Sequence, residues 1–258
     1  MSFPNYKNKY DRSSILGPEN LFKKKIIFPK LDSPVIIFLL FSDSLFDLII
    51  KNYKNTKVKG FYGDLRLFND FSGKIGILGK FGIGGPITAV LTENLSFWGV
   101  KIIISIGLGS SLVDHIEIGD IILVEKAIRD EGTSYHYEQE SKYAYASQIL
   151  LKKVKDILKQ KDISLISGPV WTTDAIYRET KEEVMELRKD TILAVEMESA
   201  TLFTVAKYCS ISSLSIIGIS DSISSLEWEF MNNIKEINNK LFDILKIVME
   251  FLNNEFIR

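Results

Sequence analysis

Short, continuous runs of apolar residues alternate along the chain with longer segments in which apolar residues recur at helical spacing. Apolar runs of this length, bounded by glycine or polar residues, are typical of strands buried on both faces. The predicted strands are 35–41, 74–79, 101–107, 120–124, 163–167, 192–195 and 214–220. The predicted helices are 86–98, 142–160, 179–189, 197–208 and 229–253. The alternation predicts an α/β fold, a three-layer α/β/α sandwich around a mixed, largely parallel central sheet.

The same pattern divides the chain in two. Residues 1–33 are polar, lysine-rich and dotted with aromatic residues, which predicts an N-terminal arm. No linker rich in proline, glycine or serine follows, so residues 34–258 are predicted to form a single domain. With 258 residues, of which 46% are hydrophobic, the chain is long enough to bury a large core.

Composition narrows the class of protein. The 32 basic and 33 acidic residues leave a net charge of −1, which gives no sign of a nucleic-acid-binding protein. The single cysteine, Cys209, excludes an internal disulfide and fits a reducing compartment, and with two histidines it forms no zinc motif, so no metal is expected. The chain begins without an apolar signal core, and the early run 35–41 is too short to span a bilayer. We therefore expect a soluble, cytoplasmic protein with no membrane partner.

The first candidate chemistry lies at residues 194–200. Two carboxylates, Glu196 and Glu198, flank Met197 where a predicted strand ends and a helix begins. A carboxylate at this place can accept two hydrogen bonds from a vicinal diol, and a methionine offers an apolar surface to a sugar. Acidic residues are also common in the first turn of a helix, where they offset the helix dipole. The segment alone leaves both interpretations open.

Further polar segments are predicted on the same rim of the sheet. Glycine loops occupy residues 79–85 and 107–111, and polar segments occupy 171–174 and 220–222. In open α/β sheets, ligands bind outside the carboxyl ends of the strands. Glycine loops at that edge could cradle an anion or let a ligand approach the backbone closely. Together with the acidic strand ends, they predict a small-molecule site.

These segments together resemble the nucleoside phosphorylase family, which includes uridine phosphorylase, hexameric purine nucleoside phosphorylase and the methylthioadenosine nucleosidases. The resemblance covers roughly residues 34–230 and rests on seven motifs in the family's order. They are GIGGP at 82–86, ISIGLG at 104–109, IGDII at 118–122, RDEGTS at 129–134, TTDA at 172–175, VEMES at 195–199 and ISD at 219–221.

The resemblance implies a nucleoside as ligand and a homo-oligomer, a hexamer of dimers, in which Tyr10 of the arm could reach a neighbouring subunit's sugar site. It implies that Met197 and Glu198 hold the ribose, with Glu196 and His136 as further ribose candidates. It also implies that Asp221 is the catalytic acid, protonating a purine as the glycosidic bond breaks. A proton donor on the base and acceptors on the sugar both favour a transition state with oxocarbenium character.

The base pocket that the resemblance implies contains Thr173, Ile176, Tyr177, Arg178 and Trp228. Family members that act on uridine generally lack an acid at the position of Asp221 and use a glutamine–arginine pair on the uracil. That pair is not evident after Asp174, which favours a purine nucleoside. Arg178 and Glu179 could still serve a pyrimidine.

The implied phosphate site departs from the family pattern. The family clamps phosphate with arginines, a glycine turn and a hydroxyl group, because the planar fork of arginine makes two charge-assisted hydrogen bonds. Here segment 41–46 has no arginine, Ser105 stands where a second arginine is expected, and Leu108 replaces the hydroxyl residue. The phosphate site formed with Gly82 and Gly109 is therefore degenerate. Candidate replacements for the missing cations are Lys59, Arg66 and Lys80.

Three functions remain open on this basis. A nucleoside phosphorylase would use inorganic phosphate as co-substrate, without a cofactor, and cleave a purine nucleoside or, alternatively, uridine. A nucleosidase would use water, with Asp43 or Asp47 as the candidate general base. The third hypothesis is a catalytically impaired, nucleoside-binding homologue or assembly subunit. We favour the phosphorylase with a rebuilt anion site.

Overall fold

The computed structural model describes residues 6, 8–24, 29, 31–163, 165–230 and 234–257. Its strands are β1 (Ile36–Leu40), β2 (Asn55–Val58), β3 (Asp64–Phe68), β4 (Ile75–Gly79), β5 (Ile102–Ser111), β6 (Ile121–Asp130), β7 (Tyr143–Tyr145), β8 (Ile166–Thr173), β9 (Ala194–Glu196), β10 (Ser212–Ser222) and β11 (Glu229–Phe230). Its α-helices are α1 (Pro18–Lys23), α2 (Asp43–Asn52), α3 (Gly85–Trp98), α4 (Gln148–Gln160), α5 (Lys181–Lys189), α6 (Ser199–Tyr208) and α7 (Ile234–Phe256). Short 3₁₀ helices are η1 (Lys9–Asp11), η2 (Asn69–Phe71), η3 (Ser134–His136) and η4 (Ile176–Arg178).

Over the described residues, one mixed sheet contains all of these strands. The order is β11-β10-β6-β8-β9-β5-β1-β4-β3-β2, and β7 pairs with β6. The longest pairings, β5 with β10 and β6 with β8, are parallel, whereas β9 and β6 run antiparallel to β5 and β10 respectively. Because β10 pairs with both β6 and β5, a closed ring of pairings connects five strands: β5, β9, β8, β6 and β10. The predicted mixed α/β fold with a central sheet is confirmed.

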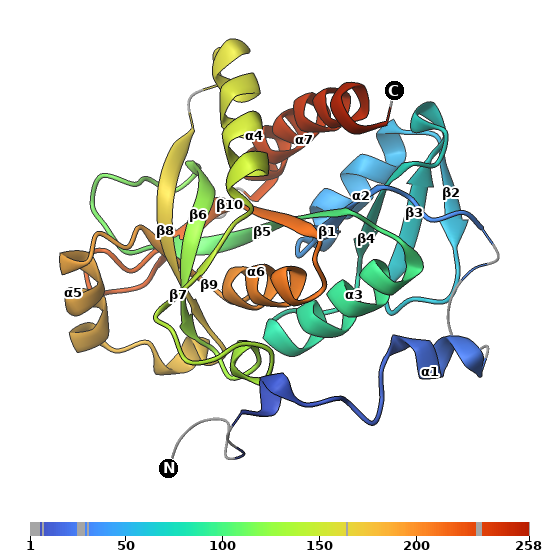
Figure 1. The fold of residues 1–258 in the computed structure, drawn as a ribbon. Coiled ribbons are helices and arrows are strands. Elements are labelled where there is room, and N and C mark those ends of the chain that lie inside the picture. The colour runs from blue at the N-terminus through green and yellow to red at the C-terminus, as the bar shows by residue number, and fades with distance from the viewer. Residues whose placement is uncertain are drawn as a thin grey trace.

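Helices cover the sheet on two sides. Figure 1 shows α3 and α6 packed together on one side, while α4 and α7 lie on the other. The central strand β1 is buried along its whole length, as expected for a strand covered on both faces. Large side chains such as Phe38, Phe46 and Phe203 fill the space between sheet and helices. The core therefore fixes the strand ends from which the site is built.

Each predicted strand and helix has an observed counterpart, but two assignments within them are wrong. Residues 143–145, predicted as helix, form strand β7, and residues 229–230, also predicted as helix, form strand β11. Both short strands exist because a neighbouring strand supplies hydrogen-bonding partners, β6 for β7 and β10 for β11. Such pairing is a tertiary constraint that overrides a local helical pattern.

The edge of the sheet was not predicted. Strands β2 and β3 form an antiparallel pair, and β3 alternates between buried Leu65 and Leu67 and the partly exposed Asp64 and Arg66.

Helix α2 was also not predicted. Its start carries a recognisable cap, in which Leu45 N–H donates to Ser42 Oγ over 3.3 Å. The segment 41–46, interpreted as a degenerate phosphate turn, is thus largely the start of this helix.

The described part of the N-terminal arm contacts η3 through η1 and α3 through α1. The Phe22 and Phe97 rings meet edge to face with centroids 5.8 Å apart, and Trp98 Nε1–H donates to Leu31 O over 3.3 Å. Figure 1 shows α1 beside α3 at the periphery. The division into an arm, 1–33, and one domain, 34–258, stays a prediction.

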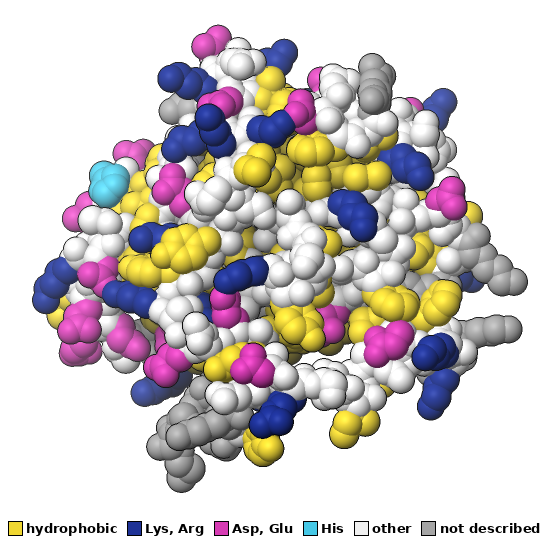
Figure 2. Space-filling model, in the orientation of Figure 1, with side chains coloured by type: hydrophobic (Ala, Val, Ile, Leu, Met, Phe, Trp, Pro, Cys, Tyr) yellow, Lys and Arg dark blue, Asp and Glu magenta, His cyan; other side chains and the backbone are white. Residues whose placement is uncertain are grey.

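The surface carries both signs of charge. Figure 2 shows acidic and basic side chains interspersed on one face, with apolar patches between them. This mixture agrees with the nearly balanced composition. Among the described residues, no helix is both long and apolar enough to cross a membrane.

Two glycines on β5 test how tightly β9 is packed. An added Cβ at Gly109 would lie 2.7 Å from Val195 O, whereas one at Gly107 would lie 3.4 Å from Phe41 Cβ, an ordinary contact. We expect Gly109→Ala to lower the free energy of unfolding by about 1–3 kcal/mol, because β9 must move. Gly107→Ala is the matched control and is expected to lose much less. Equal midpoints in denaturant titrations of the two variants would contradict this packing.

Candidate functional site

A pocket of about 720 Å³ opens at the ends of β5, β9 and β10. The loop from β8 through η4 to the start of α5 closes its other side. The residues that line it are Leu108, Gly109, Ser110, Ile176, Tyr177, Glu179, Thr180, Lys181, Val184, Val195, Glu196, Met197, Ser220, Asp221, Ile223, Leu226, Glu227, Trp228 and Phe230. The pocket therefore combines apolar side chains with several convergent carboxyl groups, as small-molecule sites do.

The sheet register brings together residues that are far apart in the sequence. Ser110 is the register partner of Asp221 on β10 and of Val195 on β9. The register of β10 against β5 shifts between Ile219 and Asp221, so Ser220 is an extra residue. Such a bulge redirects the side chains that follow it. The strand ends thereby place Asp221 beside the segment that carries Glu196 and Met197.

Asp221 accepts hydrogen bonds from three donors. Ser110 Oγ and Trp228 Nε1 donate to Oδ2, the latter over 3.0 Å, and Ser220 Oγ donates to Oδ1 over 2.6 Å. The exposed Trp228 ring stacks on Phe230 with centroids 5.5 Å apart. The carboxyl group predicted as the catalytic acid is thus oriented from two strands and from the loop beyond β10.

Glu196 is buried and both of its oxygens are occupied by the protein. Thr172 Oγ1 on β8 donates to Oε1, and the backbone N–H groups of Glu198 and Ser199 donate to Oε2 over 2.9 and 2.8 Å. Glu196 thus satisfies N–H groups at the start of α6, which have no partner within the helix. This arrangement gives Glu196 a structural role in orienting Met197 and Glu198.

Glu198 points toward the glycine loop before α3. Its Oε1 accepts from Gly84 N–H over 2.6 Å, and Met197 Cε lies 3.9 Å from the place of a Cβ on Gly84. Glu198 is almost fully buried, and it is not among the residues that line the pocket, whereas Met197 is. Burial, reinforced by the charge of Glu196, raises the pKa of Glu198 to about 8.

Glu179 is a carboxyl group with a different environment. It lines the pocket and is half-buried, and no hydrogen bond or ion pair holds its side chain within the described part of the chain. Burial raises its pKa to about 7, with smaller contributions from the charges of Asp221 and Glu183. Of the four carboxyl groups in the described lining, Asp221 and Glu196 thus have their acceptors in use, whereas Glu179 does not.

The predicted base residues are only partly brought together. Ile176, Tyr177 and Trp228 line the pocket, and Tyr177 is 93% exposed, so its ring stands at the mouth. Thr173 is buried and Arg178 is exposed, and neither lines the pocket. His136, a ribose candidate, lies on η3 with Nδ1 2.9 Å from Lys9 Nζ, and it is not among the lining residues. Tyr10 donates to Asn8 Oδ1 over 3.3 Å within the arm.

The residues of the degenerate phosphate site are dispersed. Leu108 and Gly109 line the pocket, but Ser105 is buried on β5 and its Oγ has no hydrogen-bond partner among the described residues. Gly82 lies in an open part of the glycine loop with φ of 95°. Among the described residues that line the pocket, Lys181 is the one basic side chain.

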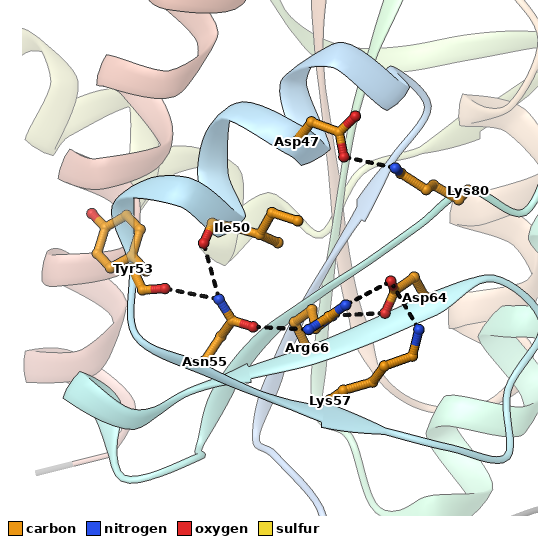
Figure 3. Close-up of polar contacts among 8 residues, drawn as sticks. All are labelled: Asp47, Ile50, Tyr53, Asn55, Lys57, Asp64, Arg66 and Lys80. Carbon is orange, nitrogen blue, oxygen red and sulfur yellow. Dashed lines mark hydrogen bonds and ion pairs between the residues drawn. The ribbon is translucent and has the colours of Figure 1, made fainter.

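Two of the three candidate replacement cations are engaged in ion pairs. Arg66 Nε and Nη2 donate to the two oxygens of Asp64 over 2.7 and 2.9 Å, and Lys80 Nζ lies 2.6 Å from Asp47 Oδ1. Figure 3 shows both pairs, with Arg66 between Asp64 and Asn55. Lys59 is exposed. None of these three cations lines the pocket, and neither do the candidate bases Asp43 and Asp47.

Sequence reasoning missed the part played by the RDEGTS motif. Buried Glu131 accepts from the N–H groups of Thr133 and Ser134, over 2.6 and 2.9 Å, and from Thr201 Oγ1 over 2.8 Å. Arg129 is buried too, and its guanidinium donates to Ser134 Oγ and to other groups of the same loop. No local pattern marks these side chains as buried, because Arg129, Asp130 and Glu131 form a run of charged residues of a kind that is usually exposed.

The raised pKa of Glu198 makes the stability of the fold depend on pH. In the unfolded chain this carboxyl group loses its proton near pH 4.5, whereas in the folded protein its pKa is about 8. Its contribution to the free energy of unfolding is therefore fully present below about pH 4.5 and is lost as pH rises through about 8. We expect thermal unfolding curves to show a melting temperature that falls from about pH 5 to about pH 9. Glu198→Gln should reduce that fall, because an amide keeps an acceptor for Gly84 N–H without a charge.

Exposed Glu182 in the first turn of α5 supplies the control for this measurement. Glu182→Gln should keep the pH dependence of the unaltered protein. If Glu198→Gln and Glu182→Gln gave the same curve of melting temperature against pH, the buried proton at Glu198 would be excluded.

Comparisons with known proteins agree with this geometry. Residues 35–250 match the family model described as the phosphorylase superfamily. A guanosine phosphorylase from Halorubrum lacusprofundi is 33% identical over 126 residues, 49% of this chain and 52% of that protein, so this match spans about half of each. A DeoD-type purine nucleoside phosphorylase from Caldanaerobacter subterraneus subsp. tengcongensis is 31% identical over 199 residues, 72% of this chain and 84% of that protein.

Solved structures show the same fold. A uridine phosphorylase from Vibrio fischeri ES114 superposes with a TM-score of 0.70 and 22% sequence identity, covering 86% of this chain and 91% of that one. The family model extends over most of the chain, from the first strand of the sheet into the last helix. The chain therefore belongs to the phosphorylase superfamily.

Proposed function

We propose that this protein cleaves the N-glycosidic bond of a purine ribonucleoside with inorganic phosphate, giving the free base and ribose 1-phosphate. The observation that carries the proposal is the placement of Asp221, held by three donors, in one pocket with Met197. Relatives named purine nucleoside phosphorylase and guanosine phosphorylase support a purine as the base of the substrate. Nucleoside phosphorylases are pentosyltransferases, so these relatives also support that enzyme class.

Asp221 is proposed to protonate the base as the glycosidic bond breaks. A purine leaves poorly as an anion, so a proton donor at the ring lowers the barrier. Ser110, Ser220 and Trp228 keep the carboxyl group at a fixed place while this proton moves. Trp228 and Phe230 provide an aromatic surface at the same end of the pocket, on which a flat ring can stack.

Met197 and Glu198 are proposed to hold the ribose, Met197 against its apolar face and Glu198 through the hydroxyl groups. Glu196 orients both by satisfying the start of α6. His136 is not among the described residues that line the pocket, and it stays a ribose candidate of this proposal. A homo-oligomer, a hexamer of dimers, also stays part of the proposal.

The proposal for the nucleophile is phosphate bound by a rebuilt and weak anion site. Arg66 and Lys80 are paired with carboxylates, and Lys181 is the basic side chain in the lining of the pocket as described. The scarcity of basic groups supports a second candidate, a nucleosidase that uses water. In both cases no cofactor is required. A uridine substrate remains the alternative for the base, and a cytoplasmic location is the expected setting.

One assay separates these functions. We expect release of base from purine nucleosides to require phosphate, with half-saturation only at high phosphate, because bidentate arginine contacts are missing. Equal release in phosphate-free buffer would identify a nucleosidase. Saturation at low phosphate would contradict the impaired anion site. Binding of nucleosides without release of base under either condition would identify an impaired homologue.

Asp221→Asn tests the catalytic acid in the same assay. We expect its turnover of purine nucleosides to fall by about 10²–10⁴, because the amide cannot deliver the proton. Asp114→Asn, at an exposed carboxylate beyond β5, is the control and should retain turnover. Wild-type turnover by Asp221→Asn would remove Asp221 from the mechanism.

A further inference from the structure

We propose that the hydroxyl group of Ser110 carries the proton from Asp221 to the leaving base, so that the acid acts through a serine. The inference rests on the proposed function, because it specifies the route by which that proton reaches the ring. It is carried by the hydrogen bonds of Asp221 and by the place of Ser110 in the lining of the same pocket.

The backbone of Ser110 is held between two strands of the sheet. Its register partner on one side is Asp221 of the parallel strand β10, and on the other side it is Val195 of the antiparallel strand β9. The contact between Ser110 Oγ and Asp221 Oδ2 therefore joins side chains whose backbones are already paired. Groups placed by strands are positioned more precisely than groups on loops.

Both oxygens of Asp221 are engaged by the protein. Oδ2 contacts Ser110 Oγ and accepts from Trp228 Nε1–H over 3.0 Å, and Oδ1 lies 2.6 Å from Ser220 Oγ. An indole N–H group can only donate, whereas a hydroxyl group can donate or accept. When Asp221 carries its proton, the hydrogen-bond partners described around it that can receive this proton are therefore Ser110 and Ser220.

The two serines differ in what else they contact, although both line the pocket. Ser220 Oγ lies 3.5 Å from Gly109 O, a backbone acceptor toward which its own proton can turn. Within the described part of the chain, Ser110 Oγ has Asp221 as its one hydrogen-bond partner. If Ser110 accepts the proton of Asp221, its own hydroxyl proton is therefore left for a ligand in the pocket.

The aromatic surface of the pocket adjoins this hydroxyl group. Trp228 Nε1 and Ser110 Oγ both contact Asp221 Oδ2, and the Trp228 ring stacks on Phe230. A purine stacked on this surface turns an edge toward the acid and its serine. Nitrogen N7 at that edge has a lone pair and no hydrogen, so it accepts from a hydroxyl group. Ser110 is thus placed to donate to the base while it accepts from Asp221.

The proton transfer balances without a further reactant. Asp221 Oδ2 gives its proton to Ser110 Oγ, while the proton of the Ser110 hydroxyl passes to N7 of the base. The electron pair of the glycosidic bond moves to the base nitrogen that leaves, and an oxygen of phosphate bonds to C1′ of the ribose. Ser110 ends with a hydroxyl group as it began, and Asp221 ends as a carboxylate, which water reprotonates after the base has left. A general acid can act through one intervening group in this way.

The test compares turnover of inosine with turnover of a nitrophenyl riboside in the same phosphate buffer. Hypoxanthine needs a proton as it leaves, whereas nitrophenolate leaves as a stable anion and needs none. We expect Ser110→Ala to lower kcat/KM for inosine by about 10–100-fold, and to change kcat/KM for the nitrophenyl riboside by less than about twofold. Ser110→Thr keeps the hydroxyl group and should restore most of the turnover of inosine.

Ser220→Ala is the matched variant, because it removes the other hydroxyl group that contacts Asp221. If the two serines only orient the acid, both alanine variants lose turnover of inosine to the same extent. If Ser110 carries the proton, the loss with Ser220→Ala is clearly smaller than the loss with Ser110→Ala.

Three results would overturn the inference. They are full turnover of inosine by Ser110→Ala, an equal loss with inosine and with the nitrophenyl riboside, and equal losses of inosine turnover in the two alanine variants. The second result would mark Ser110 as a structural residue, and the third as one that only orients Asp221. In each of these cases the unaltered protein still cleaves inosine, so only this inference fails. If the unaltered protein cleaves inosine neither with phosphate nor without it, the proposed function fails and the inference falls with it.

Discussion

The site depends on one buried carboxylate, Glu196. It accepts from Thr172 on β8 and from two N–H groups at the start of α6, so it joins two strands and a helix at a single point. A buried ionisable group is tolerated only when hydrogen bonds replace its lost hydration. Here those bonds also fix the backbone of Met197 and Glu198. The residues proposed to hold the sugar therefore owe their positions to a neighbour that need not touch it.

The carboxyl groups of the site differ by environment rather than by type. Asp221 accepts from side chains of three different segments, Glu198 is buried beside another acid, and Glu179 faces the pocket without a partner. Environments that separate the proton affinities of neighbouring acids are how proteins assign different tasks to them. The division proposed here is a proton donor in Asp221 and a sugar ligand in Glu198.

The basic residues that could form an anion site are engaged in contacts elsewhere in the protein. Arg66 is bound to Asp64, Lys80 to Asp47, and Arg129 to groups within its own loop. An arginine paired in this way already uses the planar donors that a phosphate would need. These cations are therefore not available to the pocket, and among its described lining residues Lys181 is the one basic side chain.

Local patterns in the sequence were enough to predict the alternation of strands and helices, the family resemblance and the strand ends at which Asp221 and Met197 lie. These features follow from local periodicity and from motifs of adjacent residues. The tertiary structure alone decided the pairing of Ser110 with Asp221, the capping role of Glu196, and the edge strands β2 and β3. It also decided that Glu179 and Asp221 line the same pocket and that Arg66 does not line it. Each of these depends on contacts between distant parts of the chain, which no local pattern of residues records.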